Sequence, residues 1–340
     1  MFEHLNYQPF SYFWLNCQLN NVFSVLVSVE PSYRFAAFLN DYSYNINKLP
    51  IGNHSTVRFL DLNYKDGLKK YIQDVLIYKK DILSNQDSPW SKVVSIEKYY
   101  FKSPDRFLEE IQDLLKNGQS ISVGVNLYYW VMGSIAYEKY HYNHYSLITG
   151  YNEEKHEYHT FDDDLFGYKL HMIPEERLCT AFSKSDLKEP PAFLINVFDN
   201  VRPYKLTIND VLNCADTIRK NIASIDIDNL WDVDALEKDF CEAIDNCVIN
   251  ANRVVNRHIG NKFLFESLYT LGIVKDKNSI DKYMKIEDEL IEGWIEVKNV
   301  IAMCKYSGKN ILSIEKIDGL DKKLLRKEIN IWTQVLEEFA

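Results

Sequence analysis

The sequence lacks the glycine, cysteine and histidine patterns that mark nucleotide and metal sites. Its 12 glycines are scattered and form no glycine-rich phosphate-binding loop. Its six cysteines include no Cys-x-x-Cys pair, and its eight histidines show neither His-x-His nor His-Glu-x-x-His spacing. We therefore expect no bound cofactor and no metal.

Basic charge and long apolar runs are also scarce. Lysine and arginine total 39 against 49 aspartates and glutamates, a formal net charge of -10, whereas general nucleic-acid binding needs a basic face. The longest apolar stretch near the N-terminus, residues 22–29, contains serines and is far too short to cross a bilayer. The first residues show no secretory leader pattern, and the scattered cysteines are typical of reduced thiols. We expect a cytoplasmic protein without nucleic-acid or membrane partners.

Apolar and aromatic residues are plentiful. They make up 46% and 14% of the 340 residues, which is enough for one large domain or two medium ones. Tyrosine, phenylalanine and valine with period-two patches dominate the first part, and helical periodicity dominates the second. The change falls near residues 199–203, where Pro203 stops the preceding pattern. We predict an α+β domain over 1–202 and an all-helical domain over 203–340.

A cysteine stands at the start of a predicted buried helix. Cys17 precedes apolar residues at helical spacing, and the helix should end at Pro31. The N-terminal end of a helix carries partial positive charge that favours a thiolate, and its first amides can stabilise an oxyanion. Cys17 is therefore a candidate nucleophile. We interpret the other cysteines as core residues: Cys179, Cys214, Cys241, Cys247 and Cys304.

The elements that follow predict an antiparallel sheet with helices. Ser103, Pro104 and Gly118 frame an amphipathic helix with a serine cap, a proline in its first turn and a glycine stop. Apolar alternation and turn residues predict strands at 119–127, 144–151, 156–161 and 190–198, with a short helix at 173–182.

The predicted hairpin brings a histidine close to aspartates. If its turn centres on Glu153, His144 faces Asp162, and a turn one residue longer makes it face Asp163. A histidine oriented by a carboxylate is the usual activator of a cysteine nucleophile. We therefore predict Cys17 as nucleophile, His144 as general base and Asp162, ahead of Asp163, as the orienting group.

Metal chemistry is the rival interpretation of this region. His156, His159, His171 and the aspartates at 162–164 offer nitrogen and oxygen ligands. Their spacing matches no known ligand motif, so we favour the cysteine site.

Three segments carry a resemblance to a known family. They are the block from Phe107 through Gly-Gln-Ser-Ile-Ser-Val-Gly-Val-Asn126 to Tyr129, the strand His144-Tyr-Ser-Leu-Ile-Thr-Gly-Tyr-Asn152, and Tyr158-His-Thr-Phe-Asp162. Together with the cysteine helix they resemble the butirosin biosynthesis protein H family, whose members have a papain-like fold and are related to bacteriocin-processing cysteine peptidases. The resemblance covers roughly residues 10–200, and the helical tail is also similar.

The resemblance implies a papain-like cysteine acyltransferase. Cys17 would accept the acyl group, His144 would act as base and Asp162 would orient the histidine. The donor would be a thioester on the phosphopantetheine of an acyl or peptidyl carrier protein. The acceptor would be a small-molecule amine, and the setting nonribosomal peptide or related antibiotic biosynthesis. No cofactor of the chain's own is implied.

The sequence departs from the family pattern in two places. Papain-like peptidases place an oxyanion glutamine about six residues before the cysteine, where this chain has Ser11, and Gln8 is misplaced. Asn126 stands where the family often has aspartate.

Weaker candidates for oxyanion or substrate binding are therefore Asn16, Gln18, Asn126 and Tyr129. Two other functions stay open: a cysteine peptidase or amidase with the same triad, and a non-catalytic papain-like binding module.

Overall fold

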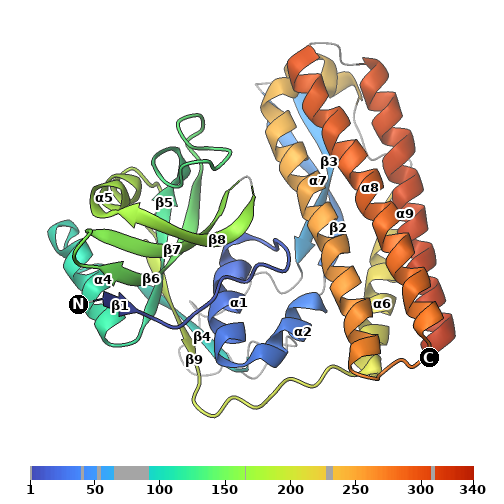
Figure 1. The fold of residues 1–340 in the computed structure, drawn as a ribbon. Helices are drawn as coiled ribbons and strands as arrows, with labels where there is room; N and C mark the ends of the chain where they lie inside the picture. The colour runs from blue at the N-terminus through green and yellow to red at the C-terminus, as the bar shows by residue number, and fades with distance from the viewer. Residues whose placement is uncertain are drawn as a thin grey trace. The chain divides into compact units, whose positions relative to one another are not determined.

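The chain has a mixed α+β architecture in two compact units (Figure 1). The computed structural model describes residues 2–39, 42–51, 55–64, 92–164, 166–226, 233–307 and 311–340. The first unit contains residues 1–37 and 68–205, and the second contains 38–67 and 206–340. Residues 38–67 thus group with the C-terminal helices, whereas the sequence predicted one continuous domain over 1–202.

The first unit is built on an antiparallel sheet. Its strand order is β4-β9-β5-β6-β7-β8, with β1 paired to the end of β6. The strand bounds are β1 Phe2–His4, β4 Val94–Tyr99, β5 Ser120–Asn126, β6 Asn143–Asn152, β7 Glu157–Asp164, β8 Gly167–Pro174 and β9 Ala192–Val197. Four of these strands lie where the sequence predicted them, and β1, β4 and β8 add to the sheet.

Helices cover both faces of this sheet. They are α1 (Cys17–Val29), α4 (Phe107–Lys116) and α5 (Glu175–Ser183), and the short helix α2 (Arg34–Phe38) crosses the boundary between the two units. Apolar residues of α4 and α5 pack in one core with Ile121 and Val123 of β5. Asn21 of α1 donates to Ser122, which alternates with those two residues along the strand. Helix α1 therefore packs on the face opposite α4 and α5.

The second unit combines a hairpin with four helices in the described ranges. The hairpin strands are β2 (Tyr42–Ile51) and β3 (Ser55–Tyr64), and the helices are α6 (Ile208–Ala223), α7 (Val233–Thr270), α8 (Lys277–Ser307) and α9 (Ile311–Phe339). Helix α7 runs without a break through Gly260. Gly260 weakens a helix without ending it, and buried neighbours such as Asn261 and Leu264 hold this stretch in the core.

A buried polar network ties the hairpin to the helices of the second unit. The hydroxyls of Tyr42 and Tyr44 donate to the Glu328 carboxylate at 2.5 and 2.7 Å. His258 contacts Glu287 at 2.6 Å, and both side chains are fully buried. Every member of this group thus finds a polar partner inside the core, as buried charges require.

Among the helices in the described ranges, none carries an apolar segment that would cross a bilayer.

Candidate active site

Cys17 is the first residue of helix α1, as the sequence predicted. The helix begins there because Asn16 has an extended backbone and its side-chain oxygen accepts the Leu19 N–H at 2.8 Å. The Asn16 side-chain oxygen is therefore used as a helix cap. The N–H of Cys17 belongs to the first turn, whose amides have no partner inside the helix.

Asn20 holds the chain that leads into Cys17. Its side-chain oxygen accepts the Leu15 N–H at 2.8 Å, and its nitrogen donates to the carbonyls of Phe10 and Phe13 at 3.2 and 3.3 Å. All of these contacts are buried, so the segment before the cysteine is fixed against the helix.

Two serines continue this attachment along the helix. Ser24 accepts the Phe10 N–H at 2.9 Å, and Ser28 accepts the Gln8 N–H at 2.8 Å. Gln8 consequently lies beside Ser28, about 16 Å along the helix axis from Cys17 at 1.5 Å per residue. Gln8 is therefore misplaced for an oxyanion role, as the sequence indicated.

The cysteine helix is anchored on β6 next to His144. Asn21 of α1 donates to the Tyr145 carbonyl at 3.0 Å, and the Tyr168 hydroxyl donates to Asn21 at 2.6 Å. The backbone N–H groups of Tyr145 and Gln18 act on the Cys17 sulfur and lower its pKa. The sulfur thus lies at the peptide group that joins His144 to Tyr145.

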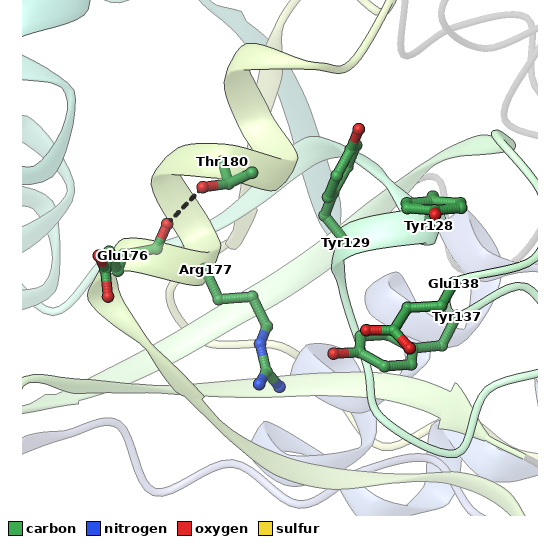
Figure 2. A pocket seen from close by; sticks show the side chains of 7 residues that line it. All are labelled: Tyr128, Tyr129, Tyr137, Glu138, Glu176, Arg177 and Thr180. Carbon is green, nitrogen blue, oxygen red and sulfur yellow. Dashed lines mark hydrogen bonds between the residues drawn. The ribbon is translucent and has the colours of Figure 1, made fainter.

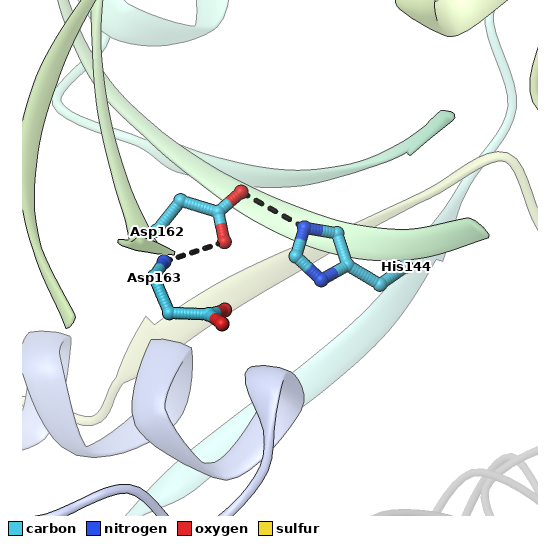
Figure 3. Close-up of side chains that lie close together, drawn as sticks. All are labelled: His144, Asp162 and Asp163. Atoms are coloured by element: carbon cyan, nitrogen blue, oxygen red, sulfur yellow. Dashed lines mark hydrogen bonds and ion pairs between the residues drawn. The ribbon is translucent and has the colours of Figure 1, made fainter. Parts of the chain in front are cut away.

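His144 and Asp162 form a buried pair across β6 and β7 (Figure 3). The Nε2 atom of His144 lies 2.8 Å from Oδ2 of Asp162, and the two side chains are 13% and 1% exposed. Trp130 donates its indole N–H to the same carboxylate oxygen at 2.6 Å. The Asp163 N–H donates to the other oxygen at 2.8 Å. Asp162, rather than Asp163, is therefore the residue that orients the imidazole.

The hairpin register differs from the predicted one. The sequence placed His144 directly opposite Asp162, but Leu147 pairs with Phe161, which shifts the register by two residues. The shift arises because the turn occupies residues 153–156 and the pairing is irregular between Ile148 and Gly150. A shift of two keeps Asp162 on the same face, so His144 reaches it as a diagonal neighbour.

Burial keeps Cys17 in the thiol form in the free protein. Burial raises the pKa of Cys17 to about 12, despite the hydrogen bond from the Tyr145 N–H, and the charges of Asp162 and Asp163 add to the rise. The predicted preference for thiolate at a helix N-terminus is therefore outweighed.

The histidine and the aspartate shift each other's ionisation. Burial lowers the pKa of His144, but the charge and hydrogen bond of Asp162 more than offset this effect. The pKa of His144 is therefore raised overall. Burial raises the pKa of Asp162, but the charge and hydrogen bond of His144 leave it below its usual value. Each group thus stabilises the charged form of the other.

Among the described residues, one group of possible metal ligands is compact. Ligand atoms of His144, Asp162 and Asp163 lie within 4.8 Å of one another. The histidine–aspartate hydrogen bond and the adjacency of the two aspartates account for this proximity, so it does not by itself define a metal site. The group excludes His156 and His171: His156 contacts Tyr151, while His171 contacts the Asp162 carbonyl.

Asn126 is occupied by structural hydrogen bonds. It is 4% exposed, its nitrogen donates to the Lys184 carbonyl at 3.0 Å, and its oxygen accepts the Tyr128 N–H at 3.1 Å. Asn126 thus ends β5 and joins it to the end of α5 through structural hydrogen bonds.

Tyr129 lines a separate pocket of about 520 Å³ (Figure 2). Arg177 enters this pocket from α5 and lies over the Tyr137 ring at 5.7 Å. Its lining residues are Tyr128, Tyr129, Tyr137, Glu138, Glu176, Arg177 and Thr180. Neither Cys17 nor His144 is among them.

The other cysteines lie on helices α5, α6, α7 and α8. Cys214 and Cys247 are buried and Cys179 is half-buried. The side chains of Cys241 and Cys304 lie outside the described residues.

Three residues that support the site were not identified from the sequence. Trp130 and Tyr145 contribute an indole N–H and a backbone N–H, which composition and spacing do not reveal. Asn21 had a visible signal, because Asn20 and Asn21 interrupt an otherwise apolar helix and a buried polar pair needs partners.

No family model matches the chain, and no curated protein matches it. The resemblance to the butirosin biosynthesis protein H family therefore stays a prediction.

Proposed function

We propose that the protein is a cysteine-dependent acyltransferase with a papain-like arrangement of Cys17, His144 and Asp162. The observation that carries the proposal is the buried His144–Asp162 pair at the point where the Tyr145 N–H meets the Cys17 sulfur. A nucleophile, a base and a group that orients the base are the parts that acyl transfer through a covalent intermediate requires.

In the first step His144 takes the proton from Cys17 as the sulfur attacks the carbonyl of a carrier-bound thioester. The carbon–sulfur bond to the carrier breaks, and His144 returns the proton to the leaving thiolate. An acyl group then sits on Cys17. Amides of the first turn of α1, above all that of Cys17, are suited to stabilise the oxyanion.

In the second step an amine attacks the acyl-cysteine. His144 takes a proton from the amine, the bond to sulfur breaks, and the Cys17 thiol regains a proton as the amide leaves. A thiol that loses its proton only during attack suits a thioester donor, because exchange between thioesters is close to balance.

The proposal is tested by intact mass spectrometry after mixing with acyl-loaded carrier proteins. We expect an acyl adduct on the wild-type chain and none on Cys17→Ser. Cys179→Ser is a matched control, because Cys179 is also a half-buried free cysteine of the first unit. It should retain the adduct.

The fate of the adduct decides between functions. Clearance by added amines with formation of an amide supports the acyltransferase. Release only as free acid, together with cleavage of peptides in the absence of a carrier, points to a peptidase or amidase. An adduct that survives Cys17→Ser, or no adduct with any carrier or small acyl thioester, contradicts the proposal.

A further inference from the structure

The pocket beside α5 has a wall of packed aromatic side chains. Tyr128 and Tyr129 belong to the 3-10 helix Leu127–Tyr129, which follows β5. The centres of the Tyr128 and His141 rings lie 4.3 Å apart in a stacked arrangement, and Tyr129 meets Tyr128 edge-on at 4.8 Å. The Glu138 N–H donates to the Tyr128 carbonyl at 3.0 Å. The wall is therefore fixed by contacts within the protein itself.

Arg177 brings a positive charge into this pocket. It is half-buried on α5, and its guanidinium lies 5.7 Å from the centre of the Tyr137 ring. In the part of the chain that the structure describes, no ion pair or hydrogen bond engages this guanidinium. A guanidinium offers N–H donors in a planar fork that matches the two oxygens of a carboxylate. Arg177 is therefore available to hold an acidic group inside the pocket.

The acidic residues of the pocket disfavour a simple anion as its ligand. Glu138 and Glu176 are exposed lining residues, and within the described ranges neither carboxylate takes part in an ion pair or a side-chain hydrogen bond. Figure 2 shows Glu138 beside Tyr137, facing the side of the pocket from which Arg177 enters. Two carboxylates beside one guanidinium repel a phosphate, whereas a ligand with one carboxylate and one ammonium group satisfies both signs of charge.

We propose that this pocket binds a free α-amino acid with an aromatic or large aliphatic side chain. Arg177 holds the carboxylate of the amino acid, Glu138 and Glu176 attract its ammonium group, and the tyrosine rings contact its side chain. The pocket volume of about 520 Å³ lies in the range of about 300–1,000 Å³ that is typical of small-molecule sites. The inference does not depend on the acyltransferase proposal, because neither Cys17 nor His144 lines this pocket.

The test is isothermal titration calorimetry of the full chain with L-phenylalanine and L-leucine as probes. We expect saturable binding of at least one of them. Two analogues of L-phenylalanine then separate its charges. The analogue without a carboxylate, 2-phenylethylamine, should bind roughly tenfold more weakly or worse, because hydrogen bonds between charged groups are lost. The analogue without an ammonium group, 3-phenylpropanoate, should bind roughly threefold more weakly or worse, because the glutamates then only repel it.

Variants assign the binding to the named residues. Arg177→Gln should weaken binding of the amino acid roughly tenfold or more. Glu138→Gln should weaken it roughly two- to fivefold, because an ion pair with an exposed carboxylate is weaker. Arg106→Gln is the matched control, since Arg106 is an arginine of the same unit that pairs with Glu109 and does not line the pocket. It should bind as the wild type does.

A second arginine variant keeps the test decisive if Arg177→Gln fails to fold. Arg177→Lys retains the charge but loses the planar fork, so it should still bind the amino acid roughly threefold more weakly or worse. Absence of binding by both probes overturns the inference, as does unchanged binding in a folded Arg177 variant. Equal affinity for 3-phenylpropanoate would show a plain anion site, and equal affinity for 2-phenylethylamine a plain cation site, and either result contradicts the proposed ligand.

Discussion

At the scale of single residues, Cys17 is subject to opposing effects. Its place at a helix start and the N–H of Tyr145 favour the thiolate, while burial and two nearby carboxylates favour the thiol. Burial is the largest of these effects, and the pKa of Cys17 is raised to about 12. In the proposed transfer, the base that removes this proton has to be close and correctly oriented, and Asp162 holds the His144 ring by a hydrogen bond.

Replacement of Asp162 should change both the size and the pH dependence of activity. Asp162 raises the pKa of His144, and only neutral imidazole accepts a proton. In Asp162→Asn the pKa of His144 falls, so the acid limb of the acylation rate should move to lower pH. The acylation rate at the plateau of the pH profile should fall by roughly a hundredfold or more, because His144 is no longer held in the correct orientation.

Stopped-flow acylation by a small acyl thioester across the pH range measures both effects. Asp164→Asn is the matched control, because it removes a carboxylate two residues away that does not contact His144. A normal plateau with an unmoved acid limb in Asp162→Asn would show that Asp162 has no such role.

At the scale of elements, the cysteine helix depends on polar side chains buried in an apolar setting. Asn20 is fully buried and satisfies one N–H and two carbonyls of the segment before Cys17. Its replacement leaves three backbone groups without partners, and each net hydrogen bond contributes about 1 kcal/mol.

Asn20→Ala should therefore lower the free energy of unfolding by roughly 2–4 kcal/mol. Urea denaturation followed by circular dichroism measures it. Gln18→Ala, two residues earlier on the same helix, should change the value by less than about 1 kcal/mol. Equal losses in the two variants would mean that the attachment by Asn20 does not stabilise the segment.

Local sequence signals predicted the helix and the strands that carry the site. Features that depend on pairing between distant residues were predicted less accurately. The start of α1 at Cys17 and its end before Pro31 followed from apolar spacing and a proline. The hairpin was predicted, but its register was wrong by two residues, because the turn and the irregularity at Ile148 depend on packing across strands. Asp162 was still identified, since a shift of two preserves the face.

At the scale of the whole molecule, the sequence could not reveal that the segment 38–67 belongs to the same unit as the C-terminal helices. Strand patterns indicate pairing but not the partner layer, and the β2–β3 hairpin groups with helices far along the chain. A polar network that only the folded structure reveals holds the β2–β3 hairpin against these helices. Glu328 on α9 accepts hydrogen bonds from Tyr42 and Tyr44 of β2 and lies 3.6 Å from His258.

Glu328→Ala should destabilise the protein strongly. It leaves two tyrosine hydroxyls without their acceptor and removes a carboxylate charge 3.6 Å from the buried His258. Removal of one partner of a buried charged group costs about 3–5 kcal/mol. Thermal and urea unfolding measure the loss. Glu337→Ala, at an exposed position of the same helix, should have little effect. Similar stability of the two variants would contradict this role of the network.

The most direct measurement of the central claim is the position of the acyl group after reaction with a carrier-bound or small acyl thioester. Digestion and peptide mass spectrometry should locate the acyl mass on the peptide that contains Cys17, and its formation should be lost in His144→Ala. An acyl group found on another cysteine, or on Cys17 at the same rate without His144, would contradict the account.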